Sequence, residues 1–167
     1  ITLGDLTIHY TRAVPGLILA PSIDSIEKSD GTEIFNITFD IYGAIQDATV
    51  ATPDGEERVY VSGKLVSTTR PDYTKLFYVD EQLTKIITPE ALTYDFSYTP
   101  DVIEATLVSP TIPDALTPVK MQYDTVFNLK KIIRQNNQII SYLDNTIQKI
   151  EEPNSAPQVF SYVKDAN

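Results

Sequence analysis

Residues that commonly carry catalysis are scarce in this 167-residue sequence. It contains one histidine, His9, no cysteine and six glycines. A Ser-His-Asp hydrolase would have to use His9, yet the Gly-x-Ser-x-Gly turn that exposes such a serine does not occur. A zinc site lacks His and Cys ligands, and no glycine-rich loop is present to hold a phosphate. We therefore interpret His9 as a surface residue of a strand and expect no nucleophilic, zinc or nucleotide chemistry.

Carboxylates are plentiful, and they are the remaining groups that could do chemistry. A pair of them could hydrolyse a glycosidic bond, and loops at 54–57 and 80–81 offer oxygen ligands to calcium. Most of the carboxylates fall at turns, however, and no twelve-residue calcium loop of the EF-hand type occurs. We predict that the chain is not an enzyme and that it has no catalytic residues, no metal site and no cofactor.

Tyrosine is the main aromatic residue, with ten tyrosines and no tryptophan. Four of the tyrosines are candidates for stacking on a sugar or contacting another protein: Tyr42, Tyr60, Tyr94 and Tyr98. Tyrosine is also a favourable strand residue, and we favour this structural explanation of the composition.

The whole chain has a net charge of -10, and its acidic residues are concentrated in the first two thirds of the sequence. Residues 1–117 contain 7 Lys and Arg against 18 Asp and Glu, whereas residues 118–152 contain 5 against 4. An acidic surface repels nucleic-acid phosphates and anionic lipid headgroups. No window approaches the roughly 20 apolar residues of a membrane helix. We expect a soluble chain without nucleic-acid or membrane partners.

Alternating apolar and polar residues predict short strands over residues 1–108. The clearest strand is 35–41, followed by a hairpin of 48–50 with 58–66 and a strand at 92–98. Weaker candidates are 6–10, 17–20, 75–79 and 102–108. Regular spacing of about seven strands, with proline and glycine between them, favours an antiparallel β-sandwich. We detect no internal repeat of useful length.

The last third of the sequence predicts a long helix. Three prolines within residues 109–118 indicate a stiff connector, 109–117, after the sandwich domain 1–108. No proline or glycine follows from Lys120 to Glu152, so we expect a helix over 118–152 of about 50 Å. Residues 153–167 are then an extended C-terminal arm.

Apolar residues recur at heptad spacing along this predicted helix, which is typical of a coiled coil. The residues predicted to oligomerise are Val126, Leu129, Ile133, Asn136, Ile140, Leu143, Ile147 and Ile150. Isoleucines beside the seam widen it, and an asparagine occupies a d position, so we favour a trimer. A dimer, or packing of the helix against a sandwich, are the alternatives.

The segment Ile133-Arg134-Gln135-Asn136 resembles the asparagine layers of trimeric phage fibres and fibrous adhesins. The order of parts, sandwich, connector, coiled coil and arm, resembles virion structural proteins such as head fibres, decoration proteins and baseplate or tail-fibre adaptors. This resemblance implies a trimeric structural subunit in a virion, with other proteins of the particle as partners. The alternative is a trimeric carbohydrate- or receptor-binding module, extracellular or on a cell surface, that uses the tyrosine-bearing face.

Overall fold

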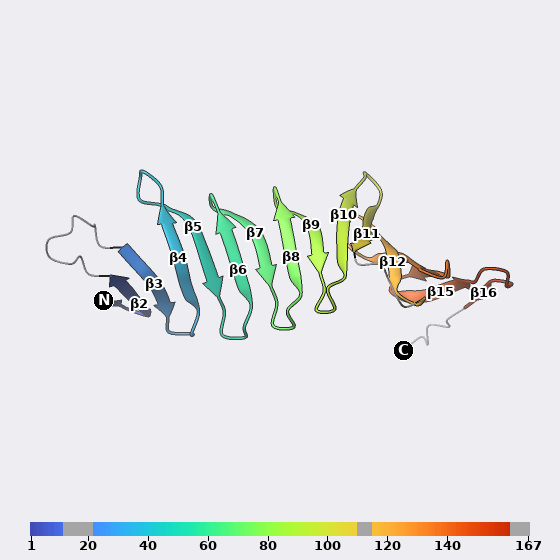
Figure 1. Cartoon of the computed structure of the whole chain (residues 1–167), viewed down its shortest axis with the longest axis horizontal. Coiled ribbons are helices and arrows are strands. Elements are labelled where there is room, and N and C mark those ends of the chain that lie inside the picture. The colour runs from blue at the N-terminus through green and yellow to red at the C-terminus, as the bar shows by residue number, and fades with distance from the viewer. Residues whose placement is uncertain (12–21, 110–114, 161–167) are drawn as a thin grey trace, which may run out of the picture. The chain divides into compact units, whose positions relative to one another are not determined.

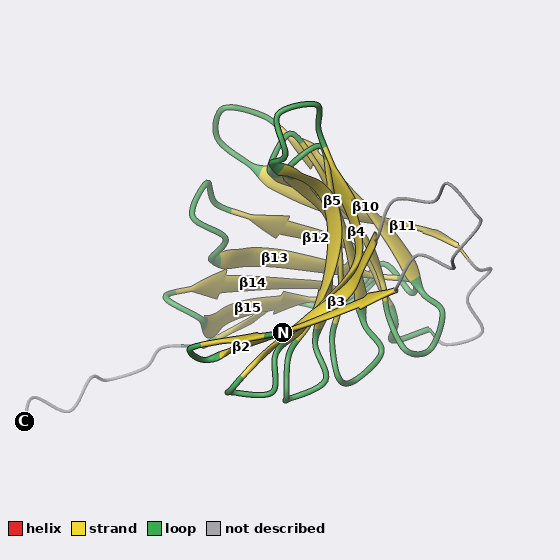
Figure 2. Cartoon of the chain, turned by 90° about the vertical axis from the view of Figure 1, so that its left-hand side faces the viewer, coloured by secondary structure: helices red, strands yellow, loops and turns green. Residues whose placement is uncertain are grey.

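A computed structural model describes residues 1–11, 22–109 and 115–160. Within these ranges every regular element is a β-strand and no helix occurs (Figures 1 and 2). The strands belong to one antiparallel sheet in which neighbouring strands follow each other in sequence. The chain divides into two compact units, the N-terminal unit 1–83 and the C-terminal unit 84–167.

The N-terminal unit is a meander of short strands, each paired with the next. Its strands are β1 (Thr2–Leu3), β2 (Leu6–Thr11), β3 (Ser22–Lys28), β4 (Glu33–Phe39), β5 (Ile45–Ala51), β6 (Glu57–Val61), β7 (Lys64–Thr69) and β8 (Lys75–Val79).

The C-terminal unit has the same construction. Its strands are β9 (Gln82–Ile87), which begins at the boundary, β10 (Thr93–Tyr98), β11 (Ile103–Ser109), β12 (Pro118–Tyr123), β13 (Leu129–Arg134), β14 (Ile139–Leu143), β15 (Thr146–Glu151) and β16 (Gln158–Val159).

Two kinds of tight turn connect these strands. In each five-residue turn the backbone N–H of the first residue donates to the carbonyl of the fifth, and the carbonyl of the first accepts from the N–H of the fourth. In the 52–56 turn Thr52 N donates to Glu56 O at 2.8 Å, and Gly55 N donates to Thr52 O at 2.9 Å. The same pair of bonds recurs at 28–32, 40–44, 70–74, 88–92, 124–128 and 134–138. The two-residue turns at 62–63, 80–81 and 144–145 have positive φ at both positions, which is the type I′ geometry.

The turns recur with a period that the sequence analysis missed. Five-residue turns begin at Thr52, Arg70 and Thr88, 18 residues apart, and the type I′ turns at Ser62 and Asp80 have the same separation. One period therefore contains a five-residue turn, a strand, a type I′ turn and a second strand. The expectation of no repeat was wrong because the repeats share turn geometry and alternation more than residue identities.

The predicted helix over 118–152 and its coiled coil are wrong, because this segment forms β12 to β15. Isoleucine is β-branched and fits a pleated sheet better than a helix. The strands are ended by Asn137 and by Asp144-Asn145, which all have positive φ. The seven-residue period is a coincidence. Short isoleucine-rich strands follow one another about every ten residues, and apolar residues from both faces of these strands happen to fall at heptad positions.

The predicted sandwich is also wrong, since consecutive strands pair side by side in one sheet. Turns this short cannot carry the chain across to a second layer. Several predicted strands are nevertheless present: 6–10, 48–50, 75–79, 92–98 and 102–108 fall in or overlap β2, β5, β8, β10 and β11. Segment 58–66 is split into β6 and β7, and 35–41 ends early, at Phe39 of β4. The predicted strand 17–20, most of the connector and the end of the arm lie outside the described residues.

A single sheet leaves little room for a core. Among the described residues, the buried apolar side chains are Ala48, Leu76, Tyr94, Ile103, Ala105 and Ile140. Large apolar side chains are exposed in both units, among them Ile41, Val79, Val126 and Leu143. Much apolar surface on the two faces of the sheet therefore stays in contact with solvent in the isolated chain.

Candidate functional site

One face of the C-terminal unit carries a continuous apolar row across six strands. Residues directly opposite each other on neighbouring strands form this row from β10 to β15: Phe96, Ala105, Met121, Ile132, Ile140 and Ile150. We call the surface centred on this row the apolar face. Because alternate residues of a strand point to opposite sides, one register places all six side chains together.

Burial on the apolar face is uneven. Ala105 is 0% exposed and Ile140 is 4% exposed, whereas Met121, Ile132 and Ile150 are only half-buried. Within the C-terminal unit the described strands pair only edge to edge with their neighbours and form one layer. Covering the half-buried side chains would stabilise a complex by about 25 cal/mol of free energy for each Å² of apolar surface removed from water.

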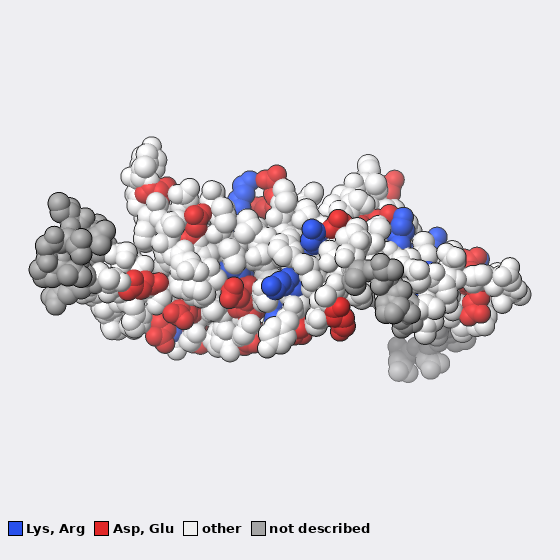
Figure 3. All heavy atoms as spheres, viewed as in Figure 1, with Lys and Arg blue, Asp and Glu red and all other residues white. Residues whose placement is uncertain are grey.

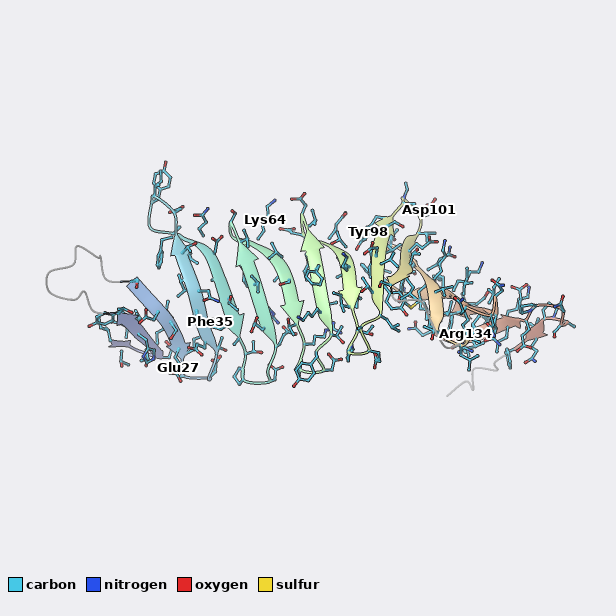
Figure 4. All side chains as sticks on the ribbon, in the orientation of Figure 1. Glu27, Phe35, Lys64, Tyr98, Asp101 and Arg134 are labelled. Carbon is cyan, nitrogen blue, oxygen red and sulfur yellow. The ribbon has the colours of Figure 1, made fainter. Side chains whose placement is uncertain are left out.

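A polar network borders the apolar face where β13 ends. Arg134 is labelled in Figure 4. Its Nη1 donates to Gln138 Oε1 at 2.6 Å, and the Gln138 Nε2 donates to Glu152 Oε1 at 2.9 Å. The Arg134 Nε is buried without a hydrogen-bond partner. The network links a cation to an anion through a buried amide, so this rim has no excess charge.

Aromatic rings border the opposite end of the apolar face, where Tyr98 lies at the end of β10 (Figure 4). The ring of Phe127 contacts Tyr98 edge-on at 6.4 Å between centroids and Tyr123 at 6.2 Å. Burial raises the pKa of the Tyr123 hydroxyl, which donates to Met121 Sδ at 3.4 Å. These contacts favour packing over ligand binding, because the rings cover one another.

The other face of the C-terminal unit, which we call the charged face, carries ion-paired side chains, and Ile133 and Ile139 lie among them. Lys120 lies 2.8 Å from Glu104, and Lys149 lies 2.7 Å from Glu151. Hydrogen bonds from Gln122 and then Lys120 to the Glu104 carboxylate lower the pKa of that group. The unit is therefore amphipathic, with one face suited to solvent and the other suited to a partner.

The N-terminal unit carries a shorter apolar row on one face. Ile8, Ile26, Ile34 and Val50 are register partners, and the row then meets Arg58. On the opposite face Glu27 and Glu33 are directly opposite each other. Acidic side chains are spread along this unit in Figure 3.

Turn carboxylates of the N-terminal unit are occupied by their own turns. The Thr32 N donates to Asp30 Oδ1 at 2.8 Å, and the Thr74 N donates to Asp72 Oδ1 at 2.9 Å; each bond lowers the pKa of that carboxyl group. The Thr52 hydroxyl does the same for Asp54. No group of three or more His, Asp or Glu side chains suited to a metal ion occurs in the described ranges.

Asp80 and His9, two other residues considered for chemistry, make exposed ion pairs. Lys64 lies 2.8 Å from Asp80 and lowers the pKa of that carboxyl group. His9 lies on β2 with Nε2 3.6 Å from Glu27, and both side chains are about half exposed. Neither pair is joined by a nucleophile, so the described residues assemble no hydrolytic site around them.

Two hollows occur on the N-terminal unit, and neither collects catalytic groups. One of about 400 Å³ is lined by Ile1, Ile8, Tyr10, Ser22 and Ile23. The other, of about 260 Å³, is lined by Gly4, Asp5, Thr7, Glu27, Lys28, Ser29 and Gly31. The first is an apolar depression beside β1, and the second is an open polar depression beside two turns.

The residues predicted to oligomerise do not lie along one seam. Ile140 and Ile150 lie on the apolar face, whereas Ile133 lies in the register row of Lys120, on the charged face. Leu129 and Ile147 lie in β13 and β15. Val126, Asn136 and Leu143 lie in a turn or at a strand end and are exposed, Val126 by 73%. Contacts of these residues with a partner stay a prediction.

The four tyrosines proposed for recognition are not brought together. Tyr42 is 88% exposed at the tip of the 40–44 turn, and Tyr60 lies in β6 of the same unit. In the other unit Tyr94 is buried, with its hydroxyl donating to Pro118 O at 3.1 Å, and Tyr98 packs against Phe127. Tyr94 and Tyr98 share one face of β10, whereas Tyr42 and Tyr60 belong to the other unit. Recognition by these tyrosines stays a prediction.

Sequence reasoning missed Phe96, Ala105, Met121 and Ile132 as one surface. Alternation in 92–98 and 102–108 was a usable signal for the first two. For the others, the usable signal was Asn136-Asn137 and Asp144-Asn145, which are turn dipeptides between isoleucine-rich runs.

Comparisons with known proteins add no family to this geometry. No family model and no curated protein matches the chain. In the described ranges no helix has the length and apolarity needed to cross a membrane. The resemblance to virion subunits depended on the coiled coil, and we do not carry it forward.

Proposed function

We propose that the chain is a structural subunit that assembles with copies of itself through its sheet. The observation that carries the proposal is the amphipathic C-terminal unit, whose apolar face spans six strands of a single layer within that unit. A sheet with one apolar face is stable only when that face packs against another element.

The chemistry of the described residues agrees with this proposal. Turn carboxylates are bonded to their own turns, and the aromatic rings of the C-terminal unit pack on each other. The net charge of -10 keeps an assembled protein soluble by mutual repulsion.

Absolute mass in solution tests the proposal. Light scattering of the full chain over a wide concentration range should give a mass that rises to a multiple of 18.7 kDa. Added salt should strengthen the association, because it screens repulsion between acidic copies without weakening apolar contacts. A mass that stays at 18.7 kDa at every concentration and salt level would contradict the proposal.

A further inference from the structure

The side of the C-terminal sheet that carries the apolar row has about the area of a small protein interface. It crosses β10 to β15, six strands of about six residues. At a strand spacing of about 4.8 Å and a rise of about 3.4 Å per residue, its footprint is about 600 Å². Stable interfaces remove roughly 600–1,000 Å² from each partner, so the face reaches the lower end of that range.

Charge selects a second copy as the occupant of this face. The C-terminal unit has 7 Lys and Arg against 10 Asp and Glu, whereas the N-terminal unit has 6 against 13. The central row of the apolar face is uncharged, and the rim network pairs Arg134 with Glu152 through Gln138. This face has no row of acidic side chains to attract a basic partner. Two copies of this acidic chain repel each other least at this face, because its central row is uncharged and its rim charges are paired.

We propose that the apolar face of the C-terminal unit packs against the same face of a second copy about a twofold axis. This inference rests on the proposed function and names the surface that performs it. The two sheets would then lie about 10 Å apart, as in a β-sandwich, with Met121, Ile132 and Ile150 between the layers. The charged faces would point outward into solvent.

The absence of cysteine allows a direct test with single cysteines in the full chain. Met121 and Ile132 are register partners on the apolar face, and Gln122 and Lys131 are register partners one residue away on the charged face. The four variants are Met121→Cys, Ile132→Cys, Gln122→Cys and Lys131→Cys. Each is treated with a short bis-maleimide, and dimers are counted on a denaturing gel. One cysteine per chain cannot cross-link within a chain.

We expect Met121→Cys and Ile132→Cys to give about tenfold more cross-linked dimer than their charged-face controls, because a twofold axis places these positions near their own copies. Circular dichroism identifies any variant that has lost its sheet. If one of the two apolar-face variants does not fold, the other still tests the inference. Equal yields from both faces, or dimer only from Gln122→Cys and Lys131→Cys, would overturn the inference.

A disrupting variant separates this inference from the proposed function. Ile132→Asp should weaken self-association about 100-fold or more, since it places a charge at the centre of an apolar interface. Lys131→Asp is the matched control and should leave association within a few fold. If wild type associates and Ile132→Asp associates equally well, the inference fails while assembly through another surface stands. If wild type is a monomer, both proposals fail.

Discussion

The two units use the same turns but specify them with different residues. All six glycines lie in residues 1–83, and the C-terminal unit has none. In three of its four five-residue turns the N-terminal unit places glycine, as at Gly55, in the left-handed position, and in the fourth it places Tyr73. The C-terminal unit places Ala91, Phe127 and Asn137 there. Turn geometry is therefore imposed by hairpin pairing as well as by glycine, and a glycine-free segment can be a meander of strands.

The units also differ in net charge and in the length and burial of their apolar rows. The N-terminal unit is strongly acidic, with a four-residue apolar row that ends at Arg58. The C-terminal unit is nearly balanced, and its row continues through six strands with Ala105 and Ile140 buried. In the proposed assembly, this difference assigns association to the C-terminal unit and leaves most of the acidic charge on the N-terminal unit.

The largest expected effect is loss of core packing in the C-terminal unit. Ile140→Ala should lower the free energy of unfolding by about 2–4 kcal/mol, because it removes buried methylene groups and leaves a cavity. Ile139→Ala, on the charged face, and Ile34→Ala, half-buried in the N-terminal unit, should each cost about 1 kcal/mol. Urea unfolding measures all three, and equal losses would contradict the assignment of the core.

The acid stability of the 124–128 turn should depend on one carboxyl group. Hydrogen bonds from the Asn128 side chain, from the Asn128 and Val126 backbone and from Lys130 lower the pKa of Asp124 from 3.8 to about 2. A lowered pKa stabilises the folded state above pH 4, and that contribution is lost as pH falls from 4 towards 2.

The measurement is the urea midpoint between pH 5 and pH 2 for wild type and for Asp124→Asn. The wild-type midpoint should fall more steeply over this interval than that of the variant, which has no carboxyl group to protonate at this position. Parallel curves would show that Asp124 does not contribute to acid stability.

A reciprocal exchange tests the contrast in turn residues. Gly55 and Ala91 occupy the same position in turns of the two units, with φ of 88° and 63°. An added Cβ at Gly55 would only meet Pro71 at 3.9 Å, so its cost is conformational. Gly55→Ala should destabilise and Ala91→Gly should stabilise, each by about 1 kcal/mol. Thermal unfolding should show opposite shifts, and two shifts of the same sign would contradict the account.

The smallest expected effect concerns the acidity of the N-terminal unit. Glu27 and Glu33 are directly opposite each other on β3 and β4. Glu33→Gln should stabilise the protein by a few tenths of a kcal/mol at low salt, by removing like-charge repulsion. The gain should vanish in 1 M NaCl, where charges are screened beyond about 3 Å. A gain that persists at high salt would have another cause.

Part of this fold could be predicted from the sequence. Alternation located β2, β8 and β10 closely, and the turn residues Pro53-Asp54-Gly55 located one hairpin. The single-layer sheet could not be predicted, because alternation shows that one face is apolar and does not show what covers it. In residues 118–152 the isoleucines fit both a heptad and a strand pattern, and only the Asn and Asp turn dipeptides distinguish the two.

The candidate surface was predicted only in part. Ile140 and Ile150 are register partners in the sheet, whereas the predicted helical seam that joined them to Ile133 does not exist. Ala105 and Met121 lie on neighbouring strands and meet only through sheet register, which a local pattern does not contain.

Met121 offers the most direct test of the account, because it is the only methionine and lies in the central row of the apolar face. Dilute peroxide converts an exposed methionine to its sulfoxide, and intact mass reports the reaction at this single site. If a second copy covers this face, oxidation of Met121 slows as protein concentration rises, and the oxidised chain associates less than the native chain. An oxidation rate that is the same at every concentration would contradict a second copy covering this face.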